Sequence, residues 1–128
     1  MLFMGKPSQR KGAEGERELA ALLRDYGFDT QRGGSLSFGE VPDLTGLPGV
    51  HIECKRVERL NVPEAMQQAI RDAERFQDGV PALFHRRNRQ PWLVTLRLED
   101  FMKLYQKGGG TNGREELQVS GARAVHRA

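Results

Sequence analysis

The sequence predicts an α/β fold in which a mixed central sheet is flanked by helices, and the hydrophobic pattern leads to it. Apolar residues recur at helical spacing in residues 13–26 and again between Asn61 and Gly79, and shorter apolar stretches separated by turn formers follow each segment. The order helix, strands, helix, strands is typical of a sheet covered by helices. A chain of 128 residues fits one compact domain.

Both helices have recognisable ends. The first carries its apolar stripe up to Tyr26 and is followed by Gly27, a residue suited to ending a helix. The second begins after Asn61, with Pro63 in its first turn, and ends near Gly79. Its stripe consists of Ala65, Ala69, Ile70, Ala73 and Phe76. A short last helix is expected over residues 98–107, before the glycine-rich run of 108–113.

The expected strands lie between these helices. A strand over residues 28–32 leads into a flexible loop, Gly33–Gly39, and a second strand begins near Val41. The turn formers in residues 46–49 separate it from a strand over residues 50–57, so residues 41–57 are predicted to form a hairpin. Strands over residues 81–86 and 92–97 follow, joined by a basic loop at 85–89.

Composition bounds the setting of the protein. Twenty basic against seventeen acidic residues give a net charge of +3, which permits a polyanionic partner without requiring one. Cys54 is the only cysteine, so no intrachain disulfide can form and a reduced, cytoplasmic setting is expected. No apolar run is long enough for a membrane span or a signal peptide. Residues 1–107 are expected to form the domain, with 1–11 as a basic arm and 108–128 as a loosely ordered tail.

The residues that carry chemistry lie on the predicted hairpin. Asp43 and Glu53 are nearly symmetric about its turn, which would make them cross-strand neighbours with Cβ atoms about 5 Å apart. Glu53 and Lys55 are two residues apart on one strand, so their side chains leave the same face, whereas Ile52 and Cys54 point into packing. Two carboxylates that close repel each other unless a cation lies between them.

This combination suits phosphodiester hydrolysis, which needs a hard cation with oxygen ligands and a group that activates water. Asp43 and Glu53 supply the oxygens, and Lys55 can hold or deprotonate the water and balance phosphate charge. A salt-bridged hairpin without catalytic function is the alternative reading of these three residues alone.

Glu16 adds weight to the catalytic interpretation. It stands three residues before Leu19 and seven before Leu23, on the face of the first helix that must turn inward. A carboxylate in that position needs a partner or a function. The neighbouring Glu14 and Glu18 are better explained as solvated glutamates that the helix dipole stabilises.

Several ordered motifs surround these residues: the run Arg10-Lys11-Gly12-Ala13-Glu14-Gly15-Glu16-Arg17-Glu18-Leu19, then Gly27-Phe28, Arg32, Gly34-Ser35, Pro42-Asp43 and Ile52-Glu53-Cys54-Lys55. In this combination they resemble those of archaeal-type Holliday junction resolvases, which belong to the PD-(D/E)xK nuclease superfamily. The resemblance covers roughly residues 10–105 and is sharpest in the first half. The loop of residues 33–39 is less basic than its counterpart in many relatives.

The resemblance implies a restriction-endonuclease-like sheet and a catalytic group of Glu16, Asp43, Glu53 and Lys55. The three carboxylates would bind Mg²⁺, with Mn²⁺ as a substitute, and Arg17, Arg32 and Ser35 would contact the DNA backbone near the cut. The implied activity is resolution of four-way DNA junctions by paired symmetric cuts that leave 5′-phosphate ends. Such paired cuts need two active sites related by a two-fold axis, so a homodimer is expected.

Further basic residues are candidates for phosphate contact. Arg86 and Arg87 lie in the connection between the last two strands, and Arg10 and Lys11 precede the first helix. A soluble hairpin tip and a solvated terminus explain these groups equally well. His51, His85 and His126 lack the spacing of metal ligands, so the histidines do not predict a zinc site.

Two other functions remain open from the residues. One is a nuclease of the same fold with another DNA substrate, of the restriction, flap or nicking type. The other is a DNA-binding accessory protein whose acidic cluster is only structural. Cleavage of linear duplex against junction separates the first from a resolvase, and binding without metal-dependent cleavage would identify the second.

Overall fold

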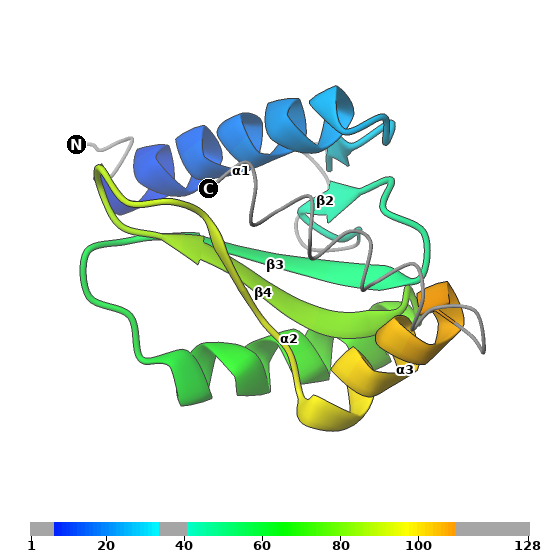
Figure 1. Cartoon of the computed structure of the whole chain (residues 1–128). Coiled ribbons are helices and arrows are strands. Elements are labelled where there is room, and N and C mark those ends of the chain that lie inside the picture. The colour runs from blue at the N-terminus through cyan, green and yellow to red at the C-terminus, as the bar shows by residue number, and fades with distance from the viewer. Residues whose placement is uncertain (1–6, 34–40, 110–128) are drawn as a thin grey trace, which may run out of the picture. The chain divides into compact units, whose positions relative to one another are not determined.

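The computed structural model describes residues 7–33 and 41–109 (Figure 1). The chain divides into two compact units, residues 1–96 and 97–128, so the first unit ends before the domain boundary expected at residue 107. No helix among the described residues is long and apolar enough to cross a membrane.

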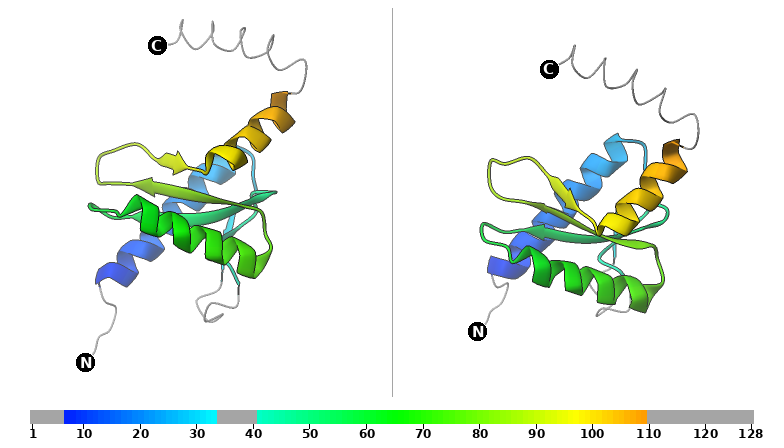
Figure 2. Two further views of the ribbon diagram at one scale, coloured as in Figure 1. Left: turned by 90° about the horizontal axis from the view of Figure 1, so that it is seen from below. Right: turned by 60° about the horizontal axis from the view of Figure 1, so that its bottom comes forward.

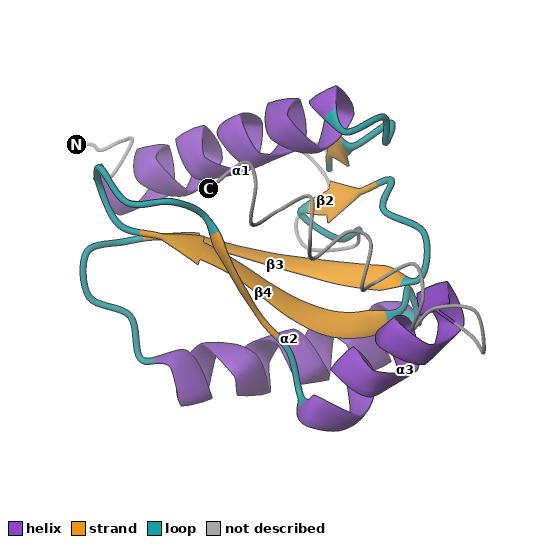
Figure 3. Cartoon of the chain, viewed as in Figure 1, coloured by secondary structure: helices purple, strands orange, loops and turns teal. Residues whose placement is uncertain are grey.

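The first unit is a sheet with a helix on each face, as the sequence predicts (Figure 3). α1 lies over one face of the sheet and α2 over the other, so the predicted α/β fold class is confirmed. The second unit contains α3. The elements are α1 (Pro7–Asp25), β1 (Gln31–Arg32), β2 (Leu44–Thr45), β3 (Val50–Arg56), α2 (Val62–Phe76), β4 (Val80–Arg86), β5 (Leu93–Thr95) and α3 (Leu98–Gly109).

The main sheet has the order β3-β4-β5 and is mixed, and Figure 2 shows it from two further sides. β3 and β4 are parallel over their whole length, from the pair Val50 and Val80 to the pair Arg56 and Arg86. Parallel neighbours need a crossover connection, which α2 provides. β5 runs antiparallel to β4, so the hairpin expected around the basic loop is confirmed.

The hairpin predicted for residues 41–57 is wrong. β2 pairs antiparallel with β1, with Arg32 opposite Leu44, whereas β3 pairs with β4. Gly46 has a φ of +108°, and a Cβ atom there would lie 2.1 Å from the carbonyl oxygen of Asp29. The chain therefore turns tightly against residue 29 and passes from the small sheet to the main sheet instead of folding back on itself.

The ends of the helices follow local chemistry. Asn61 caps α2, because its side-chain oxygen accepts a hydrogen bond of 3.1 Å from the backbone N–H of Glu64. α2 ends at Gln77, whose backbone is left-handed. α1 begins at Pro7, six residues earlier than expected, so Arg10 and Lys11 are helical and do not belong to an extended arm.

The core lies on both faces of the sheet. Under α1 it consists of Leu19, Ala20, Leu44, Ile52, Ala82 and Phe84. On the other face α2 buries only small residues, Ala65, Ala69 and Ala73. Short side chains allow a helix to approach a sheet closely, so polar groups on that face of β3 come within reach of α2.

Candidate active site

β3 separates chemistry from packing as the sequence predicts. Ile52 is buried in the core under α1, and Cys54 packs against the same cluster. Glu53 and Lys55 line cavities to which residues of α2 also contribute. The alternation of side chains along the strand therefore gives one apolar face and one polar face.

Glu53 is the most deeply placed of the expected acidic residues. It is 5% exposed, and its Oε2 atom lies 3.9 Å from the Nζ atom of Lys55. The Lys55 side chain remains 31% exposed, so its ammonium group can reach a ligand from solvent. Gln68 of α2 lines the same cavity as Lys55, whereas Gln67 is exposed.

Asp43 is held by the small sheet. Its carbonyl oxygen accepts a hydrogen bond of 2.8 Å from the backbone N–H of Gly33, next to the pairing of Arg32 with Leu44. With Glu53, Asp43 lines a small cavity of about 90 Å³. The two carboxylates thus share one cavity, although they are not the cross-strand pair that was expected.

Glu16 reaches this region from α1. Its Oε1 atom accepts a hydrogen bond of 3.1 Å from the Nε atom of Arg32. Burial, followed by the negative charge of Asp43, raises the pKa of Glu16 above its ordinary value, and the contacts with Arg32 only partly oppose this. A carboxyl group whose ionisation is opposed by burial and by a second carboxylate is suited to binding a cation.

The negative charges of the three carboxylates also affect the pKa of Cys54. Burial, together with the negative charges of Glu16, Glu53 and Asp43, raises the pKa of this thiol to about 12. The structure therefore brings the three predicted acids and Lys55 into one electrostatic neighbourhood. Carboxylate oxygens in such a group suit a hard divalent cation such as Mg²⁺, and the excess of negative charge there is what a cation would neutralise.

The structure places two further polar residues beside Glu53 that the sequence did not predict for the site. His51 is 2% exposed on β3, and Asp72 lies on α2. One ligand atom each from His51, Glu53 and Asp72 lie within 4.8 Å of one another, an arrangement that could hold a metal ion. Burial alone would lower the pKa of His51, but the carboxylates of Glu53 and Asp78 outweigh it and raise the pKa.

Comparison with known families settles what kind of protein carries this site. Residues 7–120 match the family model described as "Phage putative PDDEXK endonuclease". The chain belongs to this family of PD-(D/E)xK endonucleases. The sequence motifs for which such enzymes are named read Pro42-Asp43 and Glu53-Cys54-Lys55 here.

Among the solved structures similar to this endonuclease is that of Hjc, a Holliday junction resolvase from the archaeal hyperthermophile Archaeoglobus fulgidus. The identity is 21%, the match covers 67% of this chain and 72% of the other, and the TM-score is 0.48. No curated protein matches the chain.

The residues expected to contact DNA in this endonuclease have different environments. Arg17 and Arg87 are exposed, and Arg32 is paired with Glu16. Ser35 and the side chains of Arg10 and Lys11 lie outside the described part of the chain.

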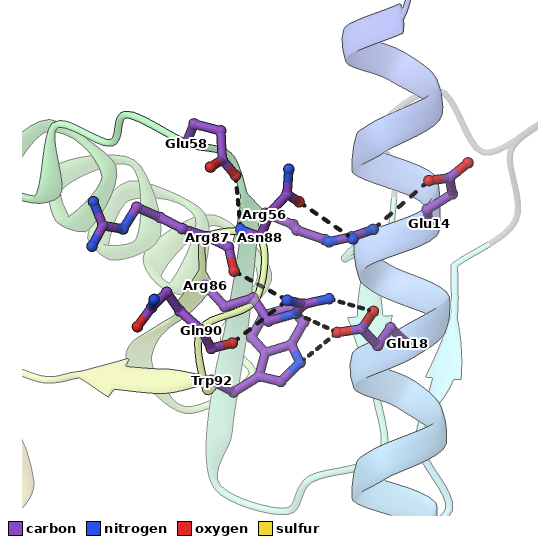
Figure 4. A network of polar contacts seen from close by, with 9 residues as sticks. All are labelled: Glu14, Glu18, Arg56, Glu58, Arg86, Arg87, Asn88, Gln90 and Trp92. Atoms are coloured by element: carbon purple, nitrogen blue, oxygen red, sulfur yellow. Dashed lines mark hydrogen bonds and ion pairs between the residues drawn. The ribbon is translucent and has the colours of Figure 1, made fainter.

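Arg86, a further candidate, is engaged within the protein (Figure 4). Its guanidinium donates to both carboxylate oxygens of Glu18, and Trp92 donates a third hydrogen bond of 2.8 Å to the same carboxylate. The guanidinium also lies 5.9 Å from the centre of the Trp92 ring. Glu18 is therefore an anchor between α1 and the β4–β5 hairpin, and its interpretation as a merely solvated glutamate is wrong.

Another cavity, of about 550 Å³, is not lined by Glu16, Asp43 or Glu53. It is lined by Arg59, Arg86 and Arg87 among others, and Arg59 also lines the cavity of Lys55. Arg59 thus joins the cavity of Lys55 to that of Arg87, and each cavity also has one acidic residue in its lining, Glu64 in the first and Glu58 in the second. Arg59 was missed in the sequence because an isolated arginine after a strand carries no motif.

Proposed function

We propose that this PD-(D/E)xK endonuclease resolves four-way (Holliday) DNA junctions by paired, symmetric hydrolysis of phosphodiester bonds that leaves 5′-phosphate ends. The observation that carries the proposal is the gathering of Glu16, Asp43 and Glu53 beside Lys55 in one site. The ordered motifs that surround these residues support the junction as substrate, because they resemble those of junction resolvases.

The proposed roles follow from charge and burial. Glu16, Asp43 and Glu53 would hold Mg²⁺, for which Mn²⁺ would substitute, and such a cation would supply Lewis-acid activation of water and of the phosphate. Lys55 orients the attacking water and balances the charge of the phosphate. Its partial exposure beside the buried Glu53 lets it meet DNA while it stays fixed to the site.

DNA binding in this proposal is dominated by backbone contacts. The scissile strand runs from Lys55 over Arg59 towards Arg87, along the two cavities that Arg59 joins. Arg10, Lys11, Arg17, Arg32 and Ser35 contact phosphates on the other side of the cut, while Arg86 holds the turn that carries Arg87. Contacts to phosphates make affinity fall steeply with salt and carry little sequence preference.

Two copies of the chain act together in this proposal. Symmetric incision of two strands needs two sites related by a two-fold axis, which a closed homodimer supplies. The enzyme would work in the cytoplasm, where its single thiol stays reduced.

The deciding experiment is cleavage of a fixed four-way junction and a linear duplex of matched sequence, each with Mg²⁺ and with EDTA. Wild type should make symmetric, metal-dependent cuts confined to the junction. Asp43→Asn should lose cleavage while it still binds the junction, and Glu74→Gln, which changes an exposed acid on α2, should cut like wild type.

Other outcomes identify the alternatives. Equal cutting of both substrates would leave a nuclease of the restriction, flap or nicking type. Tight binding with no cleavage under Mg²⁺ or Mn²⁺ would point to a DNA-binding accessory protein.

A further inference from the structure

His51 has a buried imidazole ring, and only one of its two nitrogens has a hydrogen-bond partner among the described residues. It lies two residues before Glu53 on β3 and is 2% exposed. Its ring stacks with that of Phe76, with the centroids 6.3 Å apart and the planes inclined by 14°. Both carboxylate oxygens of Asp78 lie 2.9 Å from the Nδ1 atom. Packing and hydrogen bonding therefore fix both the position and the rotation of the ring.

The other ring nitrogen, Nε2, is buried and has no hydrogen-bond partner among the residues that the structure describes. Oε1 of Glu53 lies 3.6 Å from Nε2, which is too long for a hydrogen bond. In the tautomer in which Nδ1 donates its proton to Asp78, Nε2 offers a lone pair to a cation. A metal ion bound between Nε2 and the carboxylate of Glu53 would give both groups a partner.

Asp72 completes a set of three donors. It projects from α2 one turn before Phe76, and one ligand atom each from Asp72, His51 and Glu53 lie within 4.8 Å of one another. With bonds of about 2.1 Å, ligand atoms around a tetrahedral ion are about 3.4 Å apart, close to the separation of His51 from Glu53. The same three residues line the cavity of about 90 Å³. Arg75 also lines it, but its guanidinium lies over the Phe76 ring, 4.8 Å from the centroid.

We propose that His51, Glu53 and Asp72 bind a transition-metal ion, of the Mn²⁺ or Co²⁺ class, in this cavity, and that Asp78 orients His51 for that role. Imidazole nitrogen favours transition metals, whereas Mg²⁺ prefers oxygen ligands alone. An acid that receives the far N–H of a ligating histidine is the usual support of such a ligand. The proposal shares Glu53 with the proposed nuclease site, but it stands on donors that the nuclease motifs do not include.

The test is metal binding to the full-length protein without DNA, after chelator treatment. Titrations with Mn²⁺ and Mg²⁺ are followed by calorimetry, and titration with Co²⁺ is followed by its visible absorption. Wild type should bind Mn²⁺ and Co²⁺ at least about 10-fold more tightly than Mg²⁺. His51→Gln and Asp72→Asn should each lower Co²⁺ affinity by about 10-fold or more, and Asp78→Asn by a comparable factor.

Two controls keep the result specific. His85→Gln changes a second histidine of the same sheet, whose Nε2 atom is bonded to Thr95, and should leave Co²⁺ binding unchanged. Mn²⁺ should also broaden the NMR signals of the His51 ring in the wild type, a reading that needs no variant to fold.

The proposal is overturned if His51→Gln and Asp72→Asn both bind Co²⁺ within twofold of wild type. It is equally overturned if the His51 ring stays a doubly protonated imidazolium at saturating Mn²⁺, because a proton would then be the charge between His51 and Glu53. Junction cleavage is measured separately with Mg²⁺. Cleavage without His51-dependent binding would reject only this proposal, and binding without cleavage would reject only the proposed function.

Discussion

Arg86 of β4 donates two hydrogen bonds to the carboxylate of Glu18 in α1, which lies 68 residues earlier in the sequence. Trp92 donates to the same carboxylate, so one glutamate joins the helix to both arms of the β4–β5 hairpin (Figure 4). Charge-assisted, forked contacts of this kind are the stronger class of polar interaction. By contrast, Glu14 is 59% exposed and lies 3.8 Å from Arg56.

We expect Glu18→Gln to lower the melting temperature by several degrees, because it removes the charge that Arg86 and Trp92 share. Glu14→Gln, its matched control one turn earlier, should change the melting temperature little, since exposed pairs contribute little. Calorimetry of the two variants beside wild type is the measurement. Equal melting of both variants would contradict the role assigned to Glu18.

The same pair gives a pH dependence. Chiefly through the hydrogen bonds from Arg86, the pKa of Glu18 lies below its ordinary value. A carboxyl whose pKa is lowered by folding stabilises the folded state above its unfolded pKa, and this contribution is lost as the pH falls through the folded value. The destabilisation caused by Glu18→Gln should therefore shrink between pH 6 and pH 3, which denaturant unfolding at each pH would show.

Local signals determined most of what the sequence predicted correctly. The stripe that ends at Phe76 and the cap at Asn61 define α2, and the alternation around Glu53 gives the two faces of β3. The failure at residues 41–57 has a physical cause. Turn formers show that a chain bends, but not which strand it meets afterwards, and the partner of β2 proved to be β1.

His51 was missed for a related reason. Its neighbours Asp72 and Asp78 lie in α2 and in the turn that follows it, more than 20 residues further along the chain. Spacing in the sequence therefore does not predict that they contact His51. The signal that was present is the alternation itself, because His51 shares a strand face with Glu53 and Lys55. A buried face with three polar residues in succession needs partners from the helix that covers it.

Two glycines of α1 provide a paired test of how this helix packs. A Cβ atom at Gly15 would lie 2.9 Å from the Cβ atom of Arg56 and 3.8 Å from the Sγ atom of Cys54, whereas a Cβ atom at Gly12 would meet no atom of another described element within 4 Å. Gly15→Ala should lower the free energy of unfolding by about 1–3 kcal/mol through overpacking. Gly12→Ala should raise it by roughly 0.5–1 kcal/mol, because alanine is the better helix former. Urea unfolding of both variants tests this, and equal effects would contradict close approach at Gly15.

Cys54 should be chemically inert in the folded protein. Burial and the neighbouring carboxylates raise its pKa to about 12, so at pH 8 only about one thiol in 10⁴ is ionised, and the thiolate is the form that reacts. Alkylation by iodoacetamide at pH 8 should be far slower than in denaturant, as mass spectrometry would record. If the carboxylate field contributes, the double substitution Glu16→Gln with Asp43→Asn should speed alkylation, whereas Glu74→Gln should not.

We expect the Glu16 carboxylate to be needed for cleavage and to lower the stability of the folded protein. Its pKa is raised by burial and by Asp43, so its ionised form costs stability at every pH above the folded pKa, and the cost is relieved as the pH falls through that value. At pH 7 without metal, Glu16→Gln should therefore melt at or above the wild-type temperature. Added Mg²⁺ or Mn²⁺ should raise the melting temperature of wild type more than that of the variant, since a ligand that binds only the folded state stabilises it. The same variant should lose junction cleavage. A variant that melts at a lower temperature than wild type in EDTA would contradict this prediction. It would show that the hydrogen bond with Arg32 stabilises the fold by more than the burial of the Glu16 charge costs.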